Sequence, residues 1–299
     1  MNTHQAKIEI LPTTLLDDYR PLVQELKQTA AALGLEFGWH YLLDLTWIIS
    51  QLGELGGQRV MDAGAGVGVM QWYLAEKGAQ VTSVDRSSRA DLAAKFRTRY
   101  QVSGLRLEDL HPMSQVLQHQ LSTGNMAGFS RDLSQTLVGS MKTKAPGTIK
   151  IYNQDLRTLT ELADGTFDAV VAVSALEHNP PENLAIVSRE LMRVLKPGGV
   201  LLATLGAARE RDWFHEASQG WCYTAGTLRK VFDLPPGTPD NYDRYDELFA
   251  ALAMNAELRD HLASFYSKSG ENGMPWGKWD PQYQPVGVCK VKEVSDHEF

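Results

Sequence analysis

The sequence predicts an α/β fold with a doubly wound, mostly parallel sheet and helices on both faces. Two short apolar strands, Val60–Asp62 and Gln80–Asp85, each end in a carboxylate, and a glycine-rich turn and a helix-forming segment separate them. Over 148–205, three further aliphatic strands alternate with a helical segment that begins near 182. Such alternation of strands and helices is typical of parallel sheets.

The glycine-rich turn is the most informative segment of the chain. Residues 60–68 read Val-Met-Asp-Ala-Gly-Ala-Gly-Val-Gly, so that glycine occupies every second position after Asp62. Glycine lets a ligand lie against bare backbone, and the helix that follows begins with N–H groups that have no partner inside the helix. Asp85, at the end of the next strand, is placed to accept hydrogen bonds from ribose hydroxyls. This segment therefore predicts a nucleoside-binding βαβ unit.

Two residues around the turn distinguish between nucleoside cofactors. The dinucleotide fingerprint has Gly or Ala five residues after its first glycine, whereas this chain has Val69 there. A carboxylate at Asp62 would repel a pyrophosphate, but it suits a ligand that carries an ammonium and a sulfonium group. A nicotinamide oxidoreductase is therefore the least favoured interpretation.

Together with the downstream strands, these features resemble the class I S-adenosylmethionine-dependent methyltransferases. The resemblance covers Val60–Ser87 and resumes over Thr148–Leu205. It implies a Rossmann-like core that binds S-adenosyl-L-methionine and transfers a methyl group to an O, N or C nucleophile of a small metabolite. In the cofactor site it implies, the methionine end lies at Asp62, Gly64, Gly66 and Gly68, the ribose at Asp85, and the adenine at Asp155 and Leu156.

The segment Ala175–Asn179 resembles the family's loop beside the transferred methyl group. It contains His178, just beyond the carboxyl end of a strand, where open parallel sheets bind their ligands. An imidazole titrates near neutrality and therefore suits general-base work. His178 is the candidate base or substrate contact, and the alternative is a structural histidine that caps the helix beginning near Pro180.

Further substrate-binding candidates are polar residues near aromatic ones. Glu177 has either a role toward cationic groups of the cofactor or acceptor, or a structural role. His215 and Tyr223 belong to a polar and aromatic cluster with Trp213 and Trp221. For Trp39, His40 and Tyr41, core packing and pocket lining both stay open. The aromatic residues near the C-terminus suit either a planar or cationic acceptor or an ordered surface loop; with Met274 they are Trp276, Trp279 and Tyr283.

The chain divides into three predicted parts. An N-terminal helical segment covers 1–55, the cofactor-binding core covers 56–206, and a C-terminal cap with the last strand of the sheet covers 207–299. Within the core, a helix over Ala90–Tyr100 is expected, and about 101–147 exceed what the family pattern needs. We interpret this surplus as a helical insertion that serves as a lid, as a contact in a homodimer, or only as decoration.

Composition limits the classes of partner. The 299 residues carry a net charge of −7 without a dense Lys/Arg stripe, which disfavours a nucleic-acid substrate. No apolar run approaches the roughly 20 residues of a membrane span, the first residues lack the apolar centre of a signal peptide, and Cys222 and Cys289 have no metal-ligand spacing. We expect a cytoplasmic enzyme with a small-molecule acceptor and no metal. The alternatives are an RNA or protein methyltransferase and a non-catalytic S-adenosylmethionine-binding protein.

Overall fold

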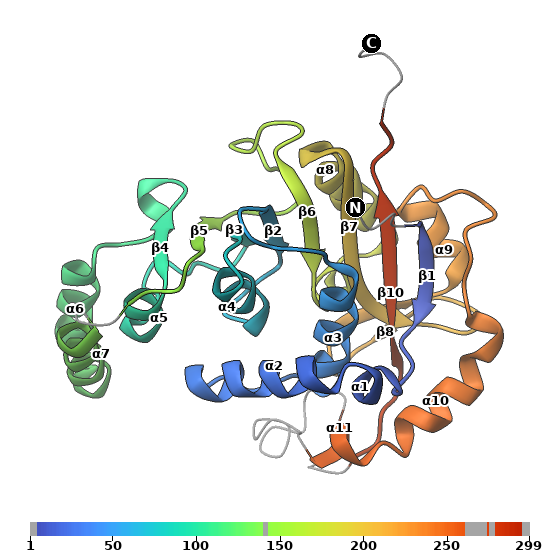
Figure 1. Cartoon of the computed structure of the whole chain (residues 1–299), viewed down its shortest axis with the longest axis horizontal. Helices are drawn as coiled ribbons and strands as arrows, with labels where there is room; N and C mark the ends of the chain where they lie inside the picture. Colours follow the sequence, from blue (N-terminus) through green and yellow to red (C-terminus); the bar gives the residue numbers. More distant parts are fainter. Residues whose placement is uncertain (1–4, 140–142, 261–273, 275–278, 295–299) are drawn as a thin grey trace. The chain divides into compact units, whose positions relative to one another are not determined.

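The computed structural model describes residues 5–139, 143–260, 274 and 279–294, and Figure 1 labels its helices and strands. The chain forms two compact units. One comprises Glu54–Leu159, and the other comprises Met1–Gly53 together with Thr160–Phe299. Most strand pairs within the units are parallel, so the predicted α/β class with a mostly parallel sheet is confirmed.

The unit 54–159 contains the glycine turn between its first strand and first helix. Its strands lie in the order β2-β3-β5-β4, and all their pairings are parallel. The elements are β2 (Arg59–Ala63), α4 (Val69–Glu76), β3 (Gln80–Asp85), α5 (Ala94–Arg99), β4 (Gln101–Gly104), η1 (Leu107–Asp109), α6 (Met113–Ser122), α7 (Met126–Gly139) and β5 (Thr148–Asn153). Because the strands are parallel and in register, Asp85 lies opposite Asn153, and both are at carboxyl ends.

Aromatic packing holds α4 in place behind the turn. Trp72 on α4 is fully buried and stacks on Phe96 of α5, with ring centroids 4.4 Å apart and planes inclined by 11°. Tyr100 closes the same cluster at 4.9 Å from Trp72. Burial of large aromatic side chains is a major source of core stability. The start of α4, and with it the glycine turn, therefore rests on a rigid base.

The insertion differs from the predicted one at its beginning. The helix expected over Ala90–Tyr100 is limited to α5, and residues 101–104 form the edge strand β4 instead of a helix. Only Val102 in that strand is apolar and none of its four residues is fully buried, so the sequence carries no hydrophobic alternation to announce it. Helices α6 and α7 follow as expected, and the buried Asp132 of α7 accepts hydrogen bonds from the Ala94 backbone and from Gln120.

The second unit is built around a mixed sheet in the order β1-β10-β7-β6. Pairing is parallel between β6 and β7 and antiparallel in β7–β10 and β10–β1, and the hairpin β8–β9 joins the end of β7. Its strands are β1 (Lys7–Ile10), β6 (Phe167–Ala172), β7 (Leu195–Ala207), β8 (Trp213–His215), β9 (Gly220–Tyr223) and β10 (Gln284–Val291). Its helices are α1 (Leu15–Asp18), α2 (Arg20–Leu33), α3 (Tyr41–Gln51), η2 (Leu176–His178), α8 (Pro181–Val194), α9 (Ala225–Val231), η3 (Tyr242–Arg244), α10 (Tyr245–Ala253) and α11 (Ala256–Asp260).

Two features of this unit were not expected. The segment 1–55 is not helical throughout, because its residues Lys7–Ile10 pair with β10 as an edge strand. Strand β7 begins at Leu195, directly after α8, and residues 196–199 form an irregularity in its pairing with β6. Helix α3 packs on β7 and β10 with its fully buried Trp47 against Gly287, where a side chain of any size would meet the indole ring.

Candidate cofactor and acceptor sites

The glycine turn has a backbone conformation that requires glycine at two positions. Gly64 and Gly66 have φ angles of 75° and 48°, in the left-handed region that side chains disfavour. The Gly64 and Ala65 N–H groups donate to the Val84 carbonyl at 2.8 and 3.0 Å, which ties the turn to the end of β3. Gly68 is the N-cap residue of α4. The first turn of a helix therefore opens beside a fixed glycine loop, as an anionic or polar ligand group requires.

Asp85 is already engaged by the loop that it closes. Its Oδ2 accepts a hydrogen bond of 2.8 Å from the Gly66 N–H, and its Oδ1 accepts one of 2.7 Å from the Ser87 N–H. The side chain is half-buried. Each carboxylate oxygen has a second lone pair, so these contacts orient the group and leave acceptor capacity for a hydroxyl pair.

Asp62 is a buried carboxyl group without a full set of partners. Its exposed fraction is 2%, and no described group donates to its Oδ2. The pKa of Asp62 is raised to about 7, chiefly by burial; the nearby Arg89 opposes this shift and Asp85 adds to it. Buried carboxylates are costly unless they are paired. A cationic ligand group would supply the missing partner.

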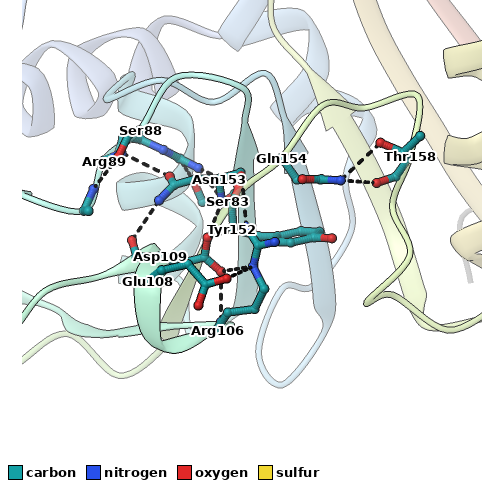
Figure 2. Close-up of polar contacts among 11 residues, drawn as sticks. Ser83, Ser88, Arg89, Arg106, Glu108, Asp109, Tyr152, Asn153, Gln154 and Thr158 are labelled. Carbon is teal, nitrogen blue, oxygen red and sulfur yellow. Dashed lines mark hydrogen bonds and ion pairs between the residues drawn. The ribbon is translucent and has the colours of Figure 1, made fainter.

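Arg89, which was not among the predicted site residues, connects the turn to two strands. Its guanidinium is buried, and its Nη2 donates to the carbonyls of Ser83 and Tyr152 at 2.9 and 3.1 Å. Its Nη1 donates to the Gly66 carbonyl at 3.2 Å and to the Ser83 hydroxyl. Figure 2 shows Arg89 close to Ser83 and Asn153. No sequence signal identifies Arg89, because arginine in a loop is usually exposed.

Gln71 on α4 holds the same turn from the other side. Its amide nitrogen lies 3.2–3.4 Å from the carbonyl oxygens of Ala65, Gly66 and Gly68, and its Oε1 accepts from the Ser83 hydroxyl at 2.7 Å. Because the carbonyls of the turn are bound on this side, its conformation is fixed before any ligand arrives. Gln71, too, was not singled out by the sequence.

Asp155 and Leu156 follow β5 and are half-buried. Asp155 forms an ion pair with Arg157, with its Oδ2 at 2.7 Å from Nη2, and this hydrogen bonding lowers the pKa of the carboxyl group. Beside it, Gln154 bonds back to Thr158 (Figure 2). The turn after β5 is thus shaped by its own side chains.

The insertion is anchored at the end of β5 through Asp109, which is fully buried in η1. Asp109 Oδ1 accepts from the Asn153 N–H at 2.9 Å, and the Asp109 carbonyl accepts from the Asn153 side-chain amide at 2.9 Å. Arg106 donates to both Asp109 oxygens and to the Asn153 carbonyl, as Figure 2 shows. The insertion therefore begins with a structural role beside the proposed adenine turn.

In the other unit, His178 lies in η2 and is exposed. Its Nδ1 is 2.9 Å from the Gln219 carbonyl, which only accepts hydrogen bonds, so Nδ1 carries a proton, and in the neutral imidazole Nε2 offers a lone pair. Helix α8 has Pro180 at its N-cap and no side-chain cap, and His178 is bonded to Gln219 instead, so its role as base or substrate contact and its structural role both stay predictions. Tyr223 is fully buried, and its hydroxyl donates to the Asn179 carbonyl in the same loop.

His215, in β8, is buried, with its Nδ1 2.7 Å from the Ser218 hydroxyl. Burial lowers the pKa of His215. Its ring centroid lies 5.3 Å from that of Tyr283, so the polar and aromatic cluster of the sequence analysis meets the aromatic residues near the C-terminus. Trp276 lies outside the described residues.

The same unit contains a buried polar cluster, which we define as His40, Asp44, Ser174, Glu177 and Tyr283. His40 Nδ1 lies 2.7 Å from Asp44 Oδ2, which also accepts from the Ser174 hydroxyl at 2.9 Å. Tyr283 Oη lies 3.5 Å from His40 Nε2. The sequence analysis left open whether His40 packs in the core or lines a pocket. Its spacing to Asp44, one helical turn later, was the available signal for their pairing.

Glu177 completes the buried cluster with a second carboxyl group. It is 8% exposed, and burial raises its pKa to about 7, with His178 and His40 opposing the shift. Within the part of the chain that the structure describes, no His, Cys, Asp and Glu side chains group as metal ligands, and no helix is long and apolar enough to cross a membrane.

Comparison with known proteins gives these sites a context. Residues 113–203 match the family described as a methyltransferase domain. This segment of the chain is therefore similar to methyltransferase domains. The resemblance to the class I enzymes is confirmed by this match and by the curated relatives below. The matched range begins after the glycine turn and includes the two helices of the insertion, so it covers α6, α7, β5, β6, η2, α8 and most of β7.

Relatives of the methyltransferase domain occur among curated proteins. The chain is 29% identical to the ubiquinone biosynthesis O-methyltransferase of Dechloromonas aromatica (strain RCB) over 164 residues, which are 54% of this chain and 50% of the relative. Identity to the protein of the same name from Bordetella bronchiseptica is 28%, over 54% of this chain and 49% of the relative. The chain thus spans about half the length of the curated relatives it matches.

Solved structures are similar at lower identity. The phosphoethanolamine N-methyltransferase 2 of Haemonchus contortus, in complex with S-adenosyl-L-methionine, superposes with a TM-score of 0.47 at 18% identity. The superposition covers 94% of this chain and 59% of that chain.

Proposed function

We propose that this protein is an S-adenosyl-L-methionine-dependent methyltransferase that acts on an O, N or C nucleophile of a small metabolite. One observation carries the proposal: a glycine turn with φ of 75° and 48° opens α4 between two carboxyl groups, Asp62 and Asp85. Asp62 lacks a partner that the cofactor's ammonium group would provide, and Asp85 is oriented for a ribose.

In this proposal, the unit 54–159 holds the donor. Gly64, Gly66 and Gly68 present backbone to the methionine end, and the turn at Asp155 and Leu156 lies against the adenine. Methyl transfer from a sulfonium is an in-line displacement in which the cofactor supplies the activated group, so the protein contributes orientation and exclusion of water.

Binding of the cofactor is the first prediction. Titration calorimetry with S-adenosyl-L-methionine and with S-adenosylhomocysteine is expected to show binding that Asp85→Ala weakens at least tenfold, because the ribose loses its acceptor and the Gly66 N–H its partner. Glu54→Ala, at an exposed acid of the same unit, is the matched control and leaves affinity unchanged. Absence of heat with both ligands would refute the proposal.

His178 is the second prediction, as the proposed base or substrate contact. Its Nε2 lone pair is available because Nδ1 is held by Gln219. General bases contribute about 100-fold or more to rate, so His178→Ala is expected to slow transfer to an identified acceptor by about that factor while cofactor affinity stays constant. His119→Ala, at an exposed histidine of α6, serves as control. Unchanged transfer by His178→Ala would remove His178 from the mechanism.

The class of methyl acceptor and the cellular compartment are the more specific parts of the proposal. The net charge of −7 supports a small molecule over a nucleic acid, and the buried, unpaired thiols Cys222 and Cys289 are consistent with a reducing cytoplasm. Incubation of the protein and methyl-labelled cofactor with a cell extract separates the alternatives. Label in small molecules supports the proposal; label in RNA or protein favours a macromolecular substrate, and binding without transfer favours a non-catalytic role. Light scattering tests whether the insertion supports a homodimer.

A further inference from the structure

The buried cluster contains two carboxyl groups that each lack a hydrogen-bond donor. Asp44 is fully buried, and its Oδ1 has no partner among the described residues, whereas its Oδ2 is bound by His40 and Ser174. Glu177 Oε2 is also buried without a described partner. Buried polar atoms are nearly always hydrogen-bonded. Two such oxygens in one cluster leave room for a donor that the described residues do not supply.

The two carboxyl groups lie within electrostatic reach of each other. Asp44 raises the pKa of Glu177, and Glu177 in turn raises the pKa of Tyr283, whose hydroxyl is near His40. Among the described residues, His178 and His40 lower the pKa of Glu177 and Asp44 raises it. The five residues of the cluster are therefore rich in acceptors and include no lysine or arginine to neutralise them.

Aromatic rings pack around Tyr283 at the edge of the buried cluster. Trp39 lies 5.2 Å from Tyr283 and 5.8 Å from Trp279, and His215 lies 5.3 Å from Tyr283. All three pairs meet edge to face. Aromatic faces attract organic cations, most strongly when water is excluded. Carboxylates inside and aromatic rings around them form a setting suited to an ammonium group.

Ser174 holds the cluster in a strained conformation. Its φ is 43°, in the left-handed region, although it is not glycine. Its N–H donates to Thr204 Oγ1 at 3.1 Å, and its hydroxyl donates to Asp44, so both neighbours maintain the strain. Strained residues persist where the surrounding structure fixes them, and they concentrate at functional sites. Ser174 lies just past the carboxyl end of β6, where parallel strands present their ligands.

We propose that the buried cluster binds a positively charged nitrogen group of the methyl acceptor, so that the acceptors of this enzyme are small amines or ammonium compounds. This inference rests on the proposed function. Asp44 Oδ1 and Glu177 Oε2 accept the N–H groups or face the positive charge, and Trp39 and Tyr283 line its apolar side. A neutral alcohol or phenol of the same size would leave a carboxylate unpaired, which penalises its binding.

Size-matched probes test the inference. The probes are 2-phenylethylammonium, 2-phenylethanol and 3-phenylpropionate, titrated by calorimetry in the presence of saturating S-adenosylhomocysteine so that the cofactor's own cation site is filled. The ammonium probe is expected to bind at least tenfold more tightly than the alcohol, and the carboxylate not at all. Glu177→Gln and, separately, Asp44→Asn are expected to remove this preference. Glu182→Gln, at an exposed acid on α8, keeps it.

The outcomes separate this inference from the proposed function. Equal binding of the ammonium and alcohol probes would overturn it, as would a preference that survives both substitutions. Because Asp44 is bound to His40 and Ser174, circular dichroism checks whether Asp44→Asn is folded. If Asp44→Asn is unfolded, Glu177→Gln alone tests the inference. S-adenosylhomocysteine binding is measured on the same samples. Its absence would refute the cofactor assignment, whereas its presence without an ammonium preference refutes only the acceptor class.

Discussion

Asp62→Asn is expected to stabilise the unliganded protein at pH 8 and at the same time to weaken cofactor binding at least tenfold. The pKa of Asp62 is about 7 in the folded protein, against an ordinary value of 3.8, chiefly because the group is buried. Between about pH 4 and pH 7 the folded protein therefore retains a proton that the unfolded chain releases. Stability consequently falls as pH rises through this window, and the loss is complete above about pH 7.

The size of this effect follows from the same shift. From pH 5 to pH 8 the Asp62 contribution is expected to fall by about 3 kcal/mol. Asparagine carries no charge, so the difference in unfolding free energy between Asp62→Asn and the parent should widen by about that amount over this range. Urea denaturation at both pH values measures it, with Glu54→Gln as an exposed control. A constant difference would show that Asp62 is ionised normally.

Bound cofactor should stabilise the parent protein more than Asp62→Asn, whereas without ligand the substitution is the stabilising change. A ligand with an ammonium group pairs with ionised Asp62, so S-adenosylhomocysteine is expected to raise the melting temperature of the parent protein more than that of Asp62→Asn at pH 8. Equal shifts in the two proteins would place the ammonium group elsewhere. The residue would then be a structural carboxyl without a role in recognition.

Arg89→Ala is expected to cost about 3–5 kcal/mol of stability, the range for removing one partner of a buried charged network. The change leaves the carbonyls of Ser83 and Tyr152 without their donor, and it removes the positive charge that lowers the pKa of Asp62. A lower urea midpoint at constant m-value is the expected readout.

Arg131→Ala provides the control for Arg89. It removes an exposed arginine from the same unit and should change stability by less than about 0.5 kcal/mol. Two urea midpoints that coincide would mean that the guanidinium of Arg89 is solvated and does not stabilise the turn.

Local patterns explain which parts of the fold the sequence predicts. The glycine turn, the strands on either side of it and α8 each carry their signal within a few residues, and they are observed. Strand β1 was not predicted, because a four-residue edge strand pairs through backbone with residues almost 280 positions away. Strand β4 was missed for a different reason, because its four residues carry no hydrophobic alternation.

The candidate sites show the same limit at the level of side chains. Glycine and acid positions in the turn were predictable because a motif constrains them. Arg89 and the grouping of the buried cluster were not, although some members of the cluster were candidates. The grouping depends on contacts between distant segments: Ser174 and Asp44 are 130 positions apart, and Tyr283 and His40 are 243 apart. No periodicity within either segment carries that information.

The hydrogen bonds of Asp109 make the first residues of the insertion part of the core, unlike an ordinary surface loop. Residues 101–109 supply both the edge strand β4 and the carboxylate that caps Asn153, whereas α6 and α7 follow only after this anchor. Excising the whole insertion would uncap the strand beside the proposed adenine turn, while shortening it after Leu110 would not. Natural length variation is therefore expected to be concentrated in the two helices, and the first nine residues are expected to change together with the core to which they are bonded.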